Sequence, residues 1–305
     1  MSFSSLASTF ANNILPILLL SGAGFALGKL LHIDSRSLGR VVFYVFSPLL
    51  IFDLLLQNRL KIDEAIGVIL LPICIVSIMG LITFLLGRLF KLERPVLTSI
   101  LITTMFANTG NYGLPLVAFA FGDEALSYAG LYFVTTTLLF YTIGVLIASL
   151  GHMSLKDAAL GLFKIPTLYA VLLAILINIY SIQIPAPIER AVQLAAGGTI
   201  PLMLILLGVE LTRVQLAGSS RAMQISLPLR LLLSPLIGLL LAALLGISGA
   251  ARQGSVTESA MPSIVSATVL ATEYQLDSKL VTAIVFISTL LSPLTLTPLL
   301  VFLGQ

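Results

Sequence analysis

The chain has 305 residues, of which 58% are hydrophobic and only 10% are charged, and its mean hydropathy is +1.10. Soluble domains carry about 25% charged residues, so this chain lacks the side chains that would cover a water-facing surface. Its net charge of +3 comes from basic residues spread singly, which excludes a nucleic-acid-binding footprint. We therefore expect an all-α, multi-pass protein of the plasma (cell inner) membrane, with the lipid bilayer as its main solvent.

Ten stretches of the chain are long and apolar enough to be membrane-spanning helices. A helix needs about 20 mostly apolar residues to cross the hydrocarbon core of a bilayer. The predicted spans cover residues 8–30, 39–57, 65–90, 95–121, 125–149, 163–182, 188–211, 222–247, 252–273 and 277–303. The connections between them are short, so we expect no separate soluble domain.

The basic residues are unevenly shared between the connections that join these spans. The odd-numbered connections carry Lys29, Arg36, Arg40, Arg88, Lys91, Arg94, Lys156, Lys164, Arg213, Arg221 and Lys279. The even-numbered connections carry only Arg59, Lys61, Arg190 and Arg252. Because Lys and Arg are enriched in cytoplasmic loops, the odd connections are predicted to be cytoplasmic and both termini to lie outside.

The two halves of the chain resemble each other. "VFSPLLIF" is similar to "GTIPLMLI", "FVTTTLL" is similar to "FISTLL", and Pro16 and Pro115 have counterparts in Pro166 and Pro262. Five spans per half is an odd number, so the second half must enter the membrane from the opposite face. This pattern predicts two inverted five-helix repeats joined by a short cytoplasmic connector, at residues 1–150, 163–305 and 151–162 respectively.

The fourth predicted span carries polar and helix-breaking residues in the stretch "NTGNYGLP". Pro115 has no N–H and clashes with the carbonyl of residue 111, while Gly110 and Gly113 lower the cost of leaving helical geometry. Backbone groups freed in lipid must find partners, which Asn108 and Asn111 can supply. We therefore expect this helix to be broken.

The ninth predicted span has the corresponding feature in "TESAMPSIVSATVL", where Glu258 precedes Pro262 by four residues. Two broken helices at matching places in inverted halves indicate a binding site near the membrane midplane. The half-helices after Pro115 and Pro262 would direct their positive N-terminal ends at that site, which favours an anion. The alternative is a pair of ordinary proline kinks with the asparagines holding helices together. The candidate substrate-binding residues are Asn108, Asn111, Gly113, Pro115, Glu258 and Pro262.

The remaining charged residues of the spans have more than one interpretation. Glu258 is a candidate proton or cation coupling group or substrate partner, unless the ninth span starts later and leaves it at the outer interface. Asp53 is a second coupling candidate that could equally be interfacial. Arg230 is interpreted as snorkelling to the cytoplasmic interface, rather than as an anion ligand. Glu210 is explained by an interfacial pair with Arg213.

Other motifs point away from enzymes and metal proteins. Two His and one Cys, far apart in the chain, give no basis for a metal site, and no cofactor is expected. The sequence contains no GxSxG, HExxH or P-loop motif, so we expect no enzyme activity. Gly24 and Gly28, four residues apart, indicate a face for close helix packing.

The stretch "NTGNYGLPLVAFAFG" resembles the fourth-helix motif of the auxin efflux carrier family, which includes plant PIN proteins and many prokaryotic members. "SAMPSIVSATVLATEYQLD" is similar to the ninth-helix motif of that family, including its proline and a Glu-Tyr pair. Glu258 departs from the uncharged residue that the plant members have there, which argues against auxin as the substrate. The long central cytoplasmic loop of many plant members is also missing.

The resemblance implies a ten-helix, inverted-repeat fold like that of the bile-acid carriers. Spans 1, 2, 6 and 7 would form a scaffold that makes a homodimer, and spans 3–5 and 8–10 a transport domain that moves like an elevator. Asn111, Pro115 and Pro262 match site positions of the family. The leading hypothesis is a secondary active or facilitated transporter of a small organic anion of the carboxylate type, with H⁺ or Na⁺ left open as the coupling ion. The alternative is a membrane channel or a receptor-like protein without a transport cycle.

Overall fold

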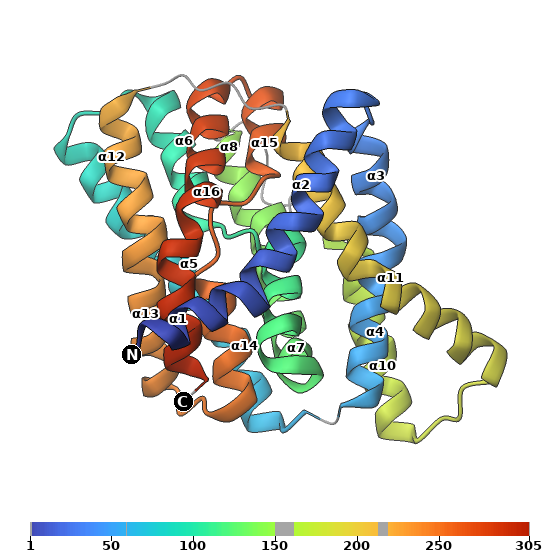
Figure 1. Cartoon of the computed structure of the whole chain (residues 1–305). Helices are drawn as coiled ribbons and strands as arrows, with labels where there is room; N and C mark the ends of the chain where they lie inside the picture. Colours follow the sequence, from blue (N-terminus) through green and yellow to red (C-terminus); the bar gives the residue numbers. More distant parts are fainter. Residues whose placement is uncertain (1, 59, 150–161, 213–218, 305) are drawn as a thin grey trace.

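The structure, a computed structural model of the whole chain, describes residues 2–58, 60–149, 162–212 and 219–304 (Figure 1). Every named element within these ranges is helical. Seven segments of the described chain are long and apolar enough to cross a membrane. They are Phe3–Leu30, Ser35–Gln57, Ile62–Leu89, Thr109–Ala148, Ala186–Leu211, Ser220–Leu244 and Ser278–Leu303. The fold is therefore that of an all-helical, multi-pass membrane protein, as predicted.

The elements follow one another with short connections. Those of the first half are α1 (Phe3–Thr9), η1 (Phe10–Ile14), α2 (Leu15–Leu30), α3 (Ser35–Val41), η2 (Val42–Phe46), α4 (Ser47–Gln57), α5 (Ile62–Leu89), α6 (Arg94–Met105), η3 (Thr109–Gly113), α7 (Leu114–Leu139), η4 (Phe140–Gly144) and α8 (Val145–Ala148). Those of the second half are α10 (Pro166–Tyr180), α11 (Ala186–Leu211), α12 (Ser220–Pro228), η5 (Leu229–Leu233), α13 (Ser234–Leu244), α14 (Gly249–Ser259), α15 (Ala267–Glu273) and α16 (Ser278–Leu303). The elements marked η are single π-helical turns. The connector predicted over 151–162 lies outside the described residues, apart from Leu162.

The ten predicted spans and the seven long segments differ at identifiable places. Gly122 has a φ of 76° and a ψ of −168°, so the backbone turns sharply inside the segment Thr109–Ala148. The helix α10 covers only 15 residues. The predicted span 252–273 is divided between α14 and α15. The count of ten spans and the inverted relation of the two halves stay predictions.

Prolines explain four of the five described π-helical turns. Pro16, Pro48, Pro115 and Pro235 each follow the last residue of a π turn by two positions, after η1, η2, η3 and η5 respectively. A proline ring clashes with the carbonyl four residues earlier, and that residue lies within the π turn in each case. A π turn accommodates the ring because its hydrogen bonds span five residues rather than four.

Glycines bring α2 and α11 into backbone contact. A Cβ added at Gly24 would overlap the Ile205 carbonyl, and one added at Gly208 would overlap the Ser21 carbonyl. The close-packing face predicted from Gly24 and Gly28 is confirmed. The helix α4 packs against both α10 and α11, so α2, α4, α10 and α11 form one packed group.

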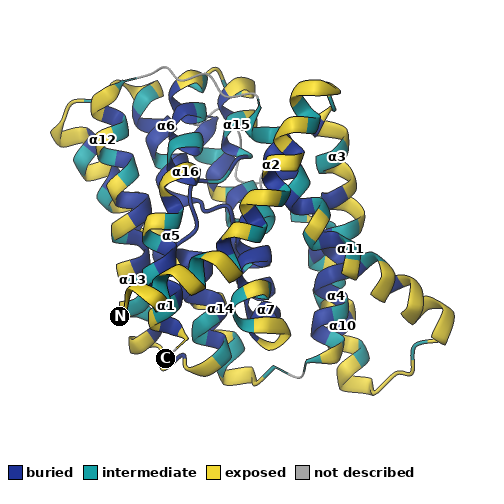
Figure 2. Cartoon of the chain, in the orientation of Figure 1, coloured by how far each residue is buried: buried dark blue, intermediate teal, exposed yellow. Residues whose placement is uncertain are grey.

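Many large apolar side chains are exposed, and many polar ones are buried. Figure 2 shows which parts of each helix are exposed and which are buried. Exposed large apolar residues of α10 include Leu172, Leu173, Leu176 and Ile179. Buried hydroxyl-bearing residues lie where α6 and α14 end, and they include Thr103, Thr104, Ser255, Thr257 and Ser259. This distribution fits a lipid solvent and a polar interior.

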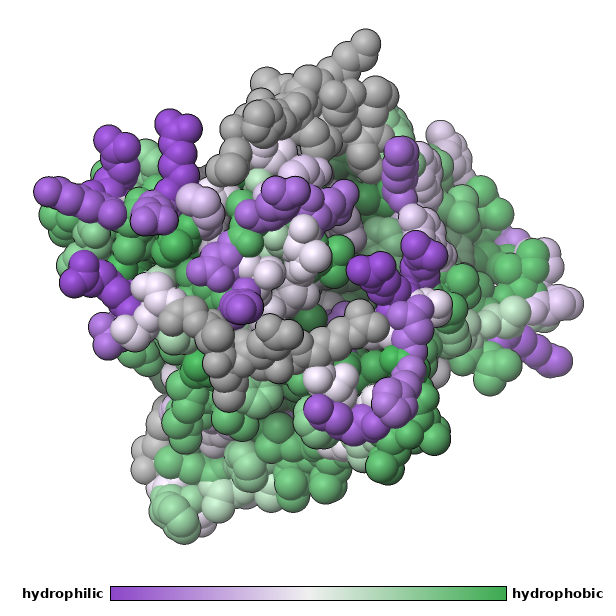
Figure 3. Space-filling view, turned by 90° about the horizontal axis from the view of Figure 1, so that it is seen from above, coloured by the Kyte–Doolittle hydropathy of each residue, from purple (hydrophilic) through white to green (hydrophobic). Residues whose placement is uncertain are grey.

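The two ends of the molecule differ. The connections 31–34, 90–93 and 274–277 lie at the upper end in Figure 1, and both termini lie in its lower part. Hydrophilic side chains gather on the upper face (Figure 3). The exposed Lys91 lies in the connection between α5 and α6, and the exposed Arg88 and Arg94 lie at the adjoining ends of these helices. The odd connections that are described therefore share one end.

We predict different effects for the same substitution at two glycines of the α2 and α11 pair. Gly208→Ala places a methyl group against the Ser21 carbonyl and should lower the free energy of unfolding by about 1–3 kcal/mol. The control, Gly22→Ala, meets nothing within 4 Å on α2 and should be neutral or stabilising by up to about 1 kcal/mol. Thermal unfolding in detergent measures both, and equal effects would contradict the contact.

Candidate functional site

The two broken helices meet through their backbones. Asn108 N–H donates to the Pro262 carbonyl at 2.8 Å, and Ile264 N–H donates to the Phe106 carbonyl at 3.0 Å. These bonds flank an antiparallel bridge between Ala107 and Ser263. At membrane depth, unpaired backbone groups are costly, and here each break supplies partners for the other.

The two breaks lie differently relative to their prolines. The first break lies before Pro115, and the second contains Pro262. The helix α6 ends at Met105, well before Pro115, which follows the π turn η3 inside the half-helix that continues into α7. Pro262 lies in the extended stretch after α14 ends at Ser259. Glu258 and Pro262 therefore do not share a helix face.

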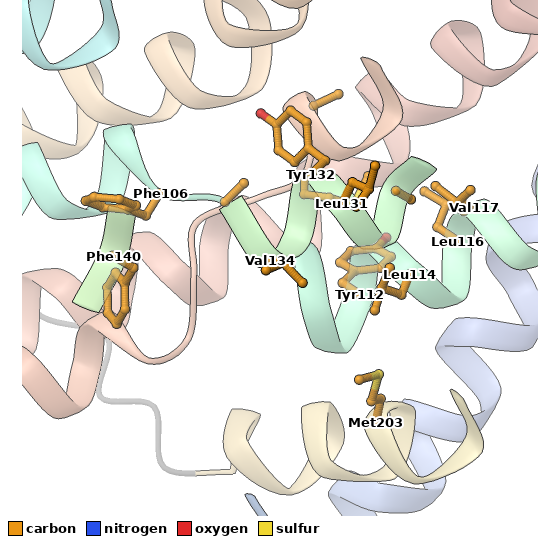
Figure 4. Packing of buried hydrophobic residues seen from close by; sticks show 14 of the residues in the cluster. Phe106, Tyr112, Leu114, Leu116, Val117, Leu131, Tyr132, Val134, Phe140 and Met203 are labelled. Atoms are coloured by element: carbon orange, nitrogen blue, oxygen red, sulfur yellow. The ribbon is translucent and has the colours of Figure 1, made fainter. Parts of the chain in front are cut away.

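We call the paired stretches 106–108 and 262–264 the crossing. Neighbouring helices form hydrogen bonds that fix its position. Ser263 Oγ donates to the Thr103 carbonyl at 2.8 Å, and Ser263 N–H donates to Ser288 Oγ of α16 at 3.2 Å. Ser292 Oγ, also on α16, donates to the Tyr112 hydroxyl at 3.1 Å. Met203 of α11 points toward Tyr112 (Figure 4). The crossing is thus tied to elements from both halves of the chain.

Glu258 lies inside the crossing and not at an interface. Its side chain is fully buried, and a Cβ added at Gly113 would overlap its carboxylate. Neither carboxylate oxygen has a hydrogen-bond partner among the described residues. Tyr132 is close enough to both Arg230 and Glu258 to interact with their charges. Because glycine has no side chain, Gly113 leaves the space that the Glu258 carboxylate occupies.

Asn108 and Asn111 have different surroundings. The Asn108 side chain is buried, and its Nδ2 group has no hydrogen-bond partner among the described residues. Asn111 Nδ2 donates to Glu210 Oε2 of α11 at 3.2 Å. The predicted pairing of Glu210 with Arg213 lies outside the described residues, and Glu210 instead links α11 to the crossing.

Arg230 is the residue that sequence reasoning missed. Its side chain is only 1% exposed, so the snorkelling interpretation is wrong. Nη1 donates to the Thr104 carbonyl at 3.0 Å, and Nη2 donates to the Ser259 carbonyl. The stretch "LPLRLLLSP" contains a signal for an irregular helix at this position. Pro235 widens the helix into the π turn that carries Arg230.

Asp53 lies away from the crossing. It is half-buried on α4 and accepts a hydrogen bond from Gln57 Nε2 at 2.8 Å. It lines a cavity of about 330 Å³ together with residues of α10, α11 and the connection between them, such as Asn178 and Glu189. None of the crossing residues lines this cavity. In the described part of the chain, no group of three or more His, Cys, Asp or Glu could hold a metal ion.

Interrupted helices that cross inside a multi-pass bundle are common in membrane transporters. Comparison with known sequences agrees: the profile of the membrane transport protein family matches residues 9–156 and 149–300. The chain belongs to this family, which confirms the resemblance to the auxin efflux carriers.

Two archaeal relatives are similar along most of their length. One, from Methanothermobacter thermautotrophicus, is described as an uncharacterized transporter; it is 32% identical over 294 residues, which cover 93% of this chain and 95% of the relative. The other, an uncharacterized transporter of Methanocaldococcus jannaschii, is 29% identical over 282 residues, or 88% and 90% of the two chains. The chain is therefore a membrane transporter.

We predict that Gly113→Ala destabilises the protein by about 1–3 kcal/mol, because the new methyl group collides with the Glu258 carboxylate. The cost should shrink when Glu258→Ala removes that carboxylate, and a double-mutant cycle measures this coupling. Gly197→Ala, in open space on α11, is the control. Additive effects of the Gly113 and Glu258 substitutions would show that the two residues do not touch.

Proposed function

We propose that this transporter is a secondary carrier of a small organic anion of the carboxylate type. The observation that carries the proposal is the backbone-paired crossing with a buried amide donor beside it. Asn108 Nδ2 lacks an acceptor, and a buried donor without a partner costs about 1–3 kcal/mol. A carboxylate oxygen of the substrate would supply that acceptor.

The start of α7 adds to this preference. Asn108 directly precedes η3, and η3 continues into α7, so the N-terminal end of this half-helix lies at the crossing. Backbone N–H groups and the helix dipole at such an end attract negative charge. Asn111 and Gly113 belong to the same turn, so the substrate would lie against Asn108, Asn111 and Gly113, with Pro115 fixing the turn and Pro262 fixing the opposite strand.

Glu258 makes the site responsive to protons under this proposal. Its carboxylate contacts Gly113, in the turn that would bind the substrate anion. Two buried negative charges so close would repel each other strongly, so the substrate is expected to bind when Glu258 is protonated. Tyr132 is in electrostatic contact with both Arg230 and Glu258, and Glu210, which accepts a hydrogen bond from Asn111, is a second carboxylate at this turn. Glu258, rather than the remote Asp53, is therefore the coupling residue that we propose.

The packing of the helices supports an elevator-like movement. The helices α2, α4, α10 and α11 would be the dimerising scaffold, since they pack on one another and expose the apolar face of α10. The elements α5–α8 and α12–α16 would form the part that moves with the substrate. The hydrogen bond between Asn111 and Glu210 joins these two groups at the site, so its exchange could accompany the movement.

The ends of the molecule support the proposed orientation. Both termini lie in the lower part of Figure 1, opposite the face with the described odd connections. We propose that this hydrophilic upper face is cytoplasmic and that both termini lie outside the plasma membrane.

We predict that Asn111→Ala abolishes transport and leaves folding intact. A screen of carboxylates by thermal shift, across pH and sodium concentration, first identifies a ligand that stabilises the protein. Uptake and counterflow of that labelled carboxylate in proteoliposomes then measure transport. The exposed Asn12→Ala is the control and should transport normally. Full transport by Asn111→Ala would refute the site, and absence of trans-stimulation in the wild type would indicate a channel.

We further predict that anion uptake by the wild type falls as the pH rises, because deprotonated Glu258 repels the substrate. Glu258→Gln cannot deprotonate, so its uptake should not change over the same pH range. Glu64→Gln, at the start of α5, is the control and should keep the wild-type profile. A Glu258→Gln profile identical to that of the wild type would exclude the coupling role.

A further inference from the structure

Two helix ends converge on one buried cation, the guanidinium of Arg230. The helices α6 and α14 end at Met105 and Ser259, and the last carbonyls of a helix have no partner within it. Arg230 donates to one carbonyl from each end, those of Thr104 and Ser259. Ser234 Oγ adds a hydrogen bond to the Ser259 carbonyl at 2.8 Å.

The positive charge of the Arg230 guanidinium balances the partial negative charges of the two helix C-termini. Each helix C-terminus is equivalent to about −0.5 elementary charge, so two ends sum to about −1. One guanidinium carries +1, and at 1% exposure water screens it little. A buried cation is tolerated only when it is paired and hydrogen-bonded. None of the described carboxylates forms an ion pair with Arg230, so the backbone ends balance its charge.

Arginine suits this place better than lysine. Its planar group presents donors in a fixed fork, and here two different nitrogens reach carbonyls from two different helices. A lysine ammonium is a compact point charge on a flexible stem. Arg230 thus acts as a clamp between the half-helices that carry the two breaks.

In transporters with discontinuous helices, unwound carbonyls and C-terminal helix ends commonly coordinate Na⁺ or H⁺. We propose that Arg230 is a built-in counter-cation that takes the place of an exchangeable metal cation at the two helix ends. The crossing then holds together in the absence of sodium, and transport needs no sodium gradient. The statement about coupling rests on the proposed transport function, whereas the charge role of Arg230 does not.

The test compares purified variants by thermal unfolding, without any substrate. Arg230→Ala should lower the unfolding temperature by about 10 °C, because it leaves two helix ends without their counter-charge. Millimolar guanidinium chloride should restore part of that loss, and choline chloride should not. Arg221→Ala, an exposed arginine of α12, is the control and should show neither the loss nor the recovery.

Two further comparisons keep the proposal testable if Arg230→Ala does not fold. Arg230→Lys keeps the charge and should be more stable than the neutral Arg230→Met. The wild type should show the same unfolding temperature, and the same uptake of the labelled carboxylate, in sodium chloride and in choline chloride. A sodium-stabilised wild type, equal stability of the Lys and Met variants, or an Arg230→Ala protein indifferent to guanidinium would each overturn the proposal. If uptake fails but guanidinium rescues Arg230→Ala, the transport function fails and the counter-cation stands.

Discussion

The structure depends on the pairing of two interrupted backbones inside a lipid-embedded bundle. A break at membrane depth exposes peptide groups that have no water to bond, so it persists only where protein supplies the partners. Here Phe106, Asn108, Pro262 and Ile264 exchange two hydrogen bonds, and the break in each half satisfies the break in the other. The prolines and glycines around the crossing lower the free-energy cost of leaving helical geometry, and the backbone pairing stabilises the breaks.

Charge at the crossing follows from the same geometry. Ending two helices at one point gathers their negative ends, and Arg230 lies where it can neutralise both. The start of α7 brings positive potential to the neighbouring turn, and the buried carboxylate of Glu258 lies against it. The Asn108 amide and the Glu258 carboxylate are both buried without hydrogen-bond partners among the described residues, so each keeps its capacity to bond a ligand.

Local patterns in the sequence predicted the helical membrane fold, the two interrupted stretches and the close packing at Gly24, because each follows from neighbouring residues. Contacts across the chain were not predictable in this way. The snorkelling interpretation of Arg230 considered only its distance from the end of a span, whereas its partners Thr104 and Ser259 come from two other helices. Similarly, Glu210 bonds Asn111, which is 99 positions away. The breaks were also placed at the prolines, although α6 already ends at Met105.

A disulfide across the crossing tests the central claim most directly. Ala107 and Ser263 face each other as a non-hydrogen-bonded antiparallel pair, for which Cα atoms lie about 4.5 Å apart, within the range that a disulfide spans. With Cys74→Ser to remove the native thiol, Ala107→Cys and Ser263→Cys should become linked on oxidation, as detected by mass spectrometry of the proteolysed protein. The shifted pair Ala107→Cys and Ser266→Cys should stay reduced. Free thiols in both pairs after oxidation would contradict the crossing.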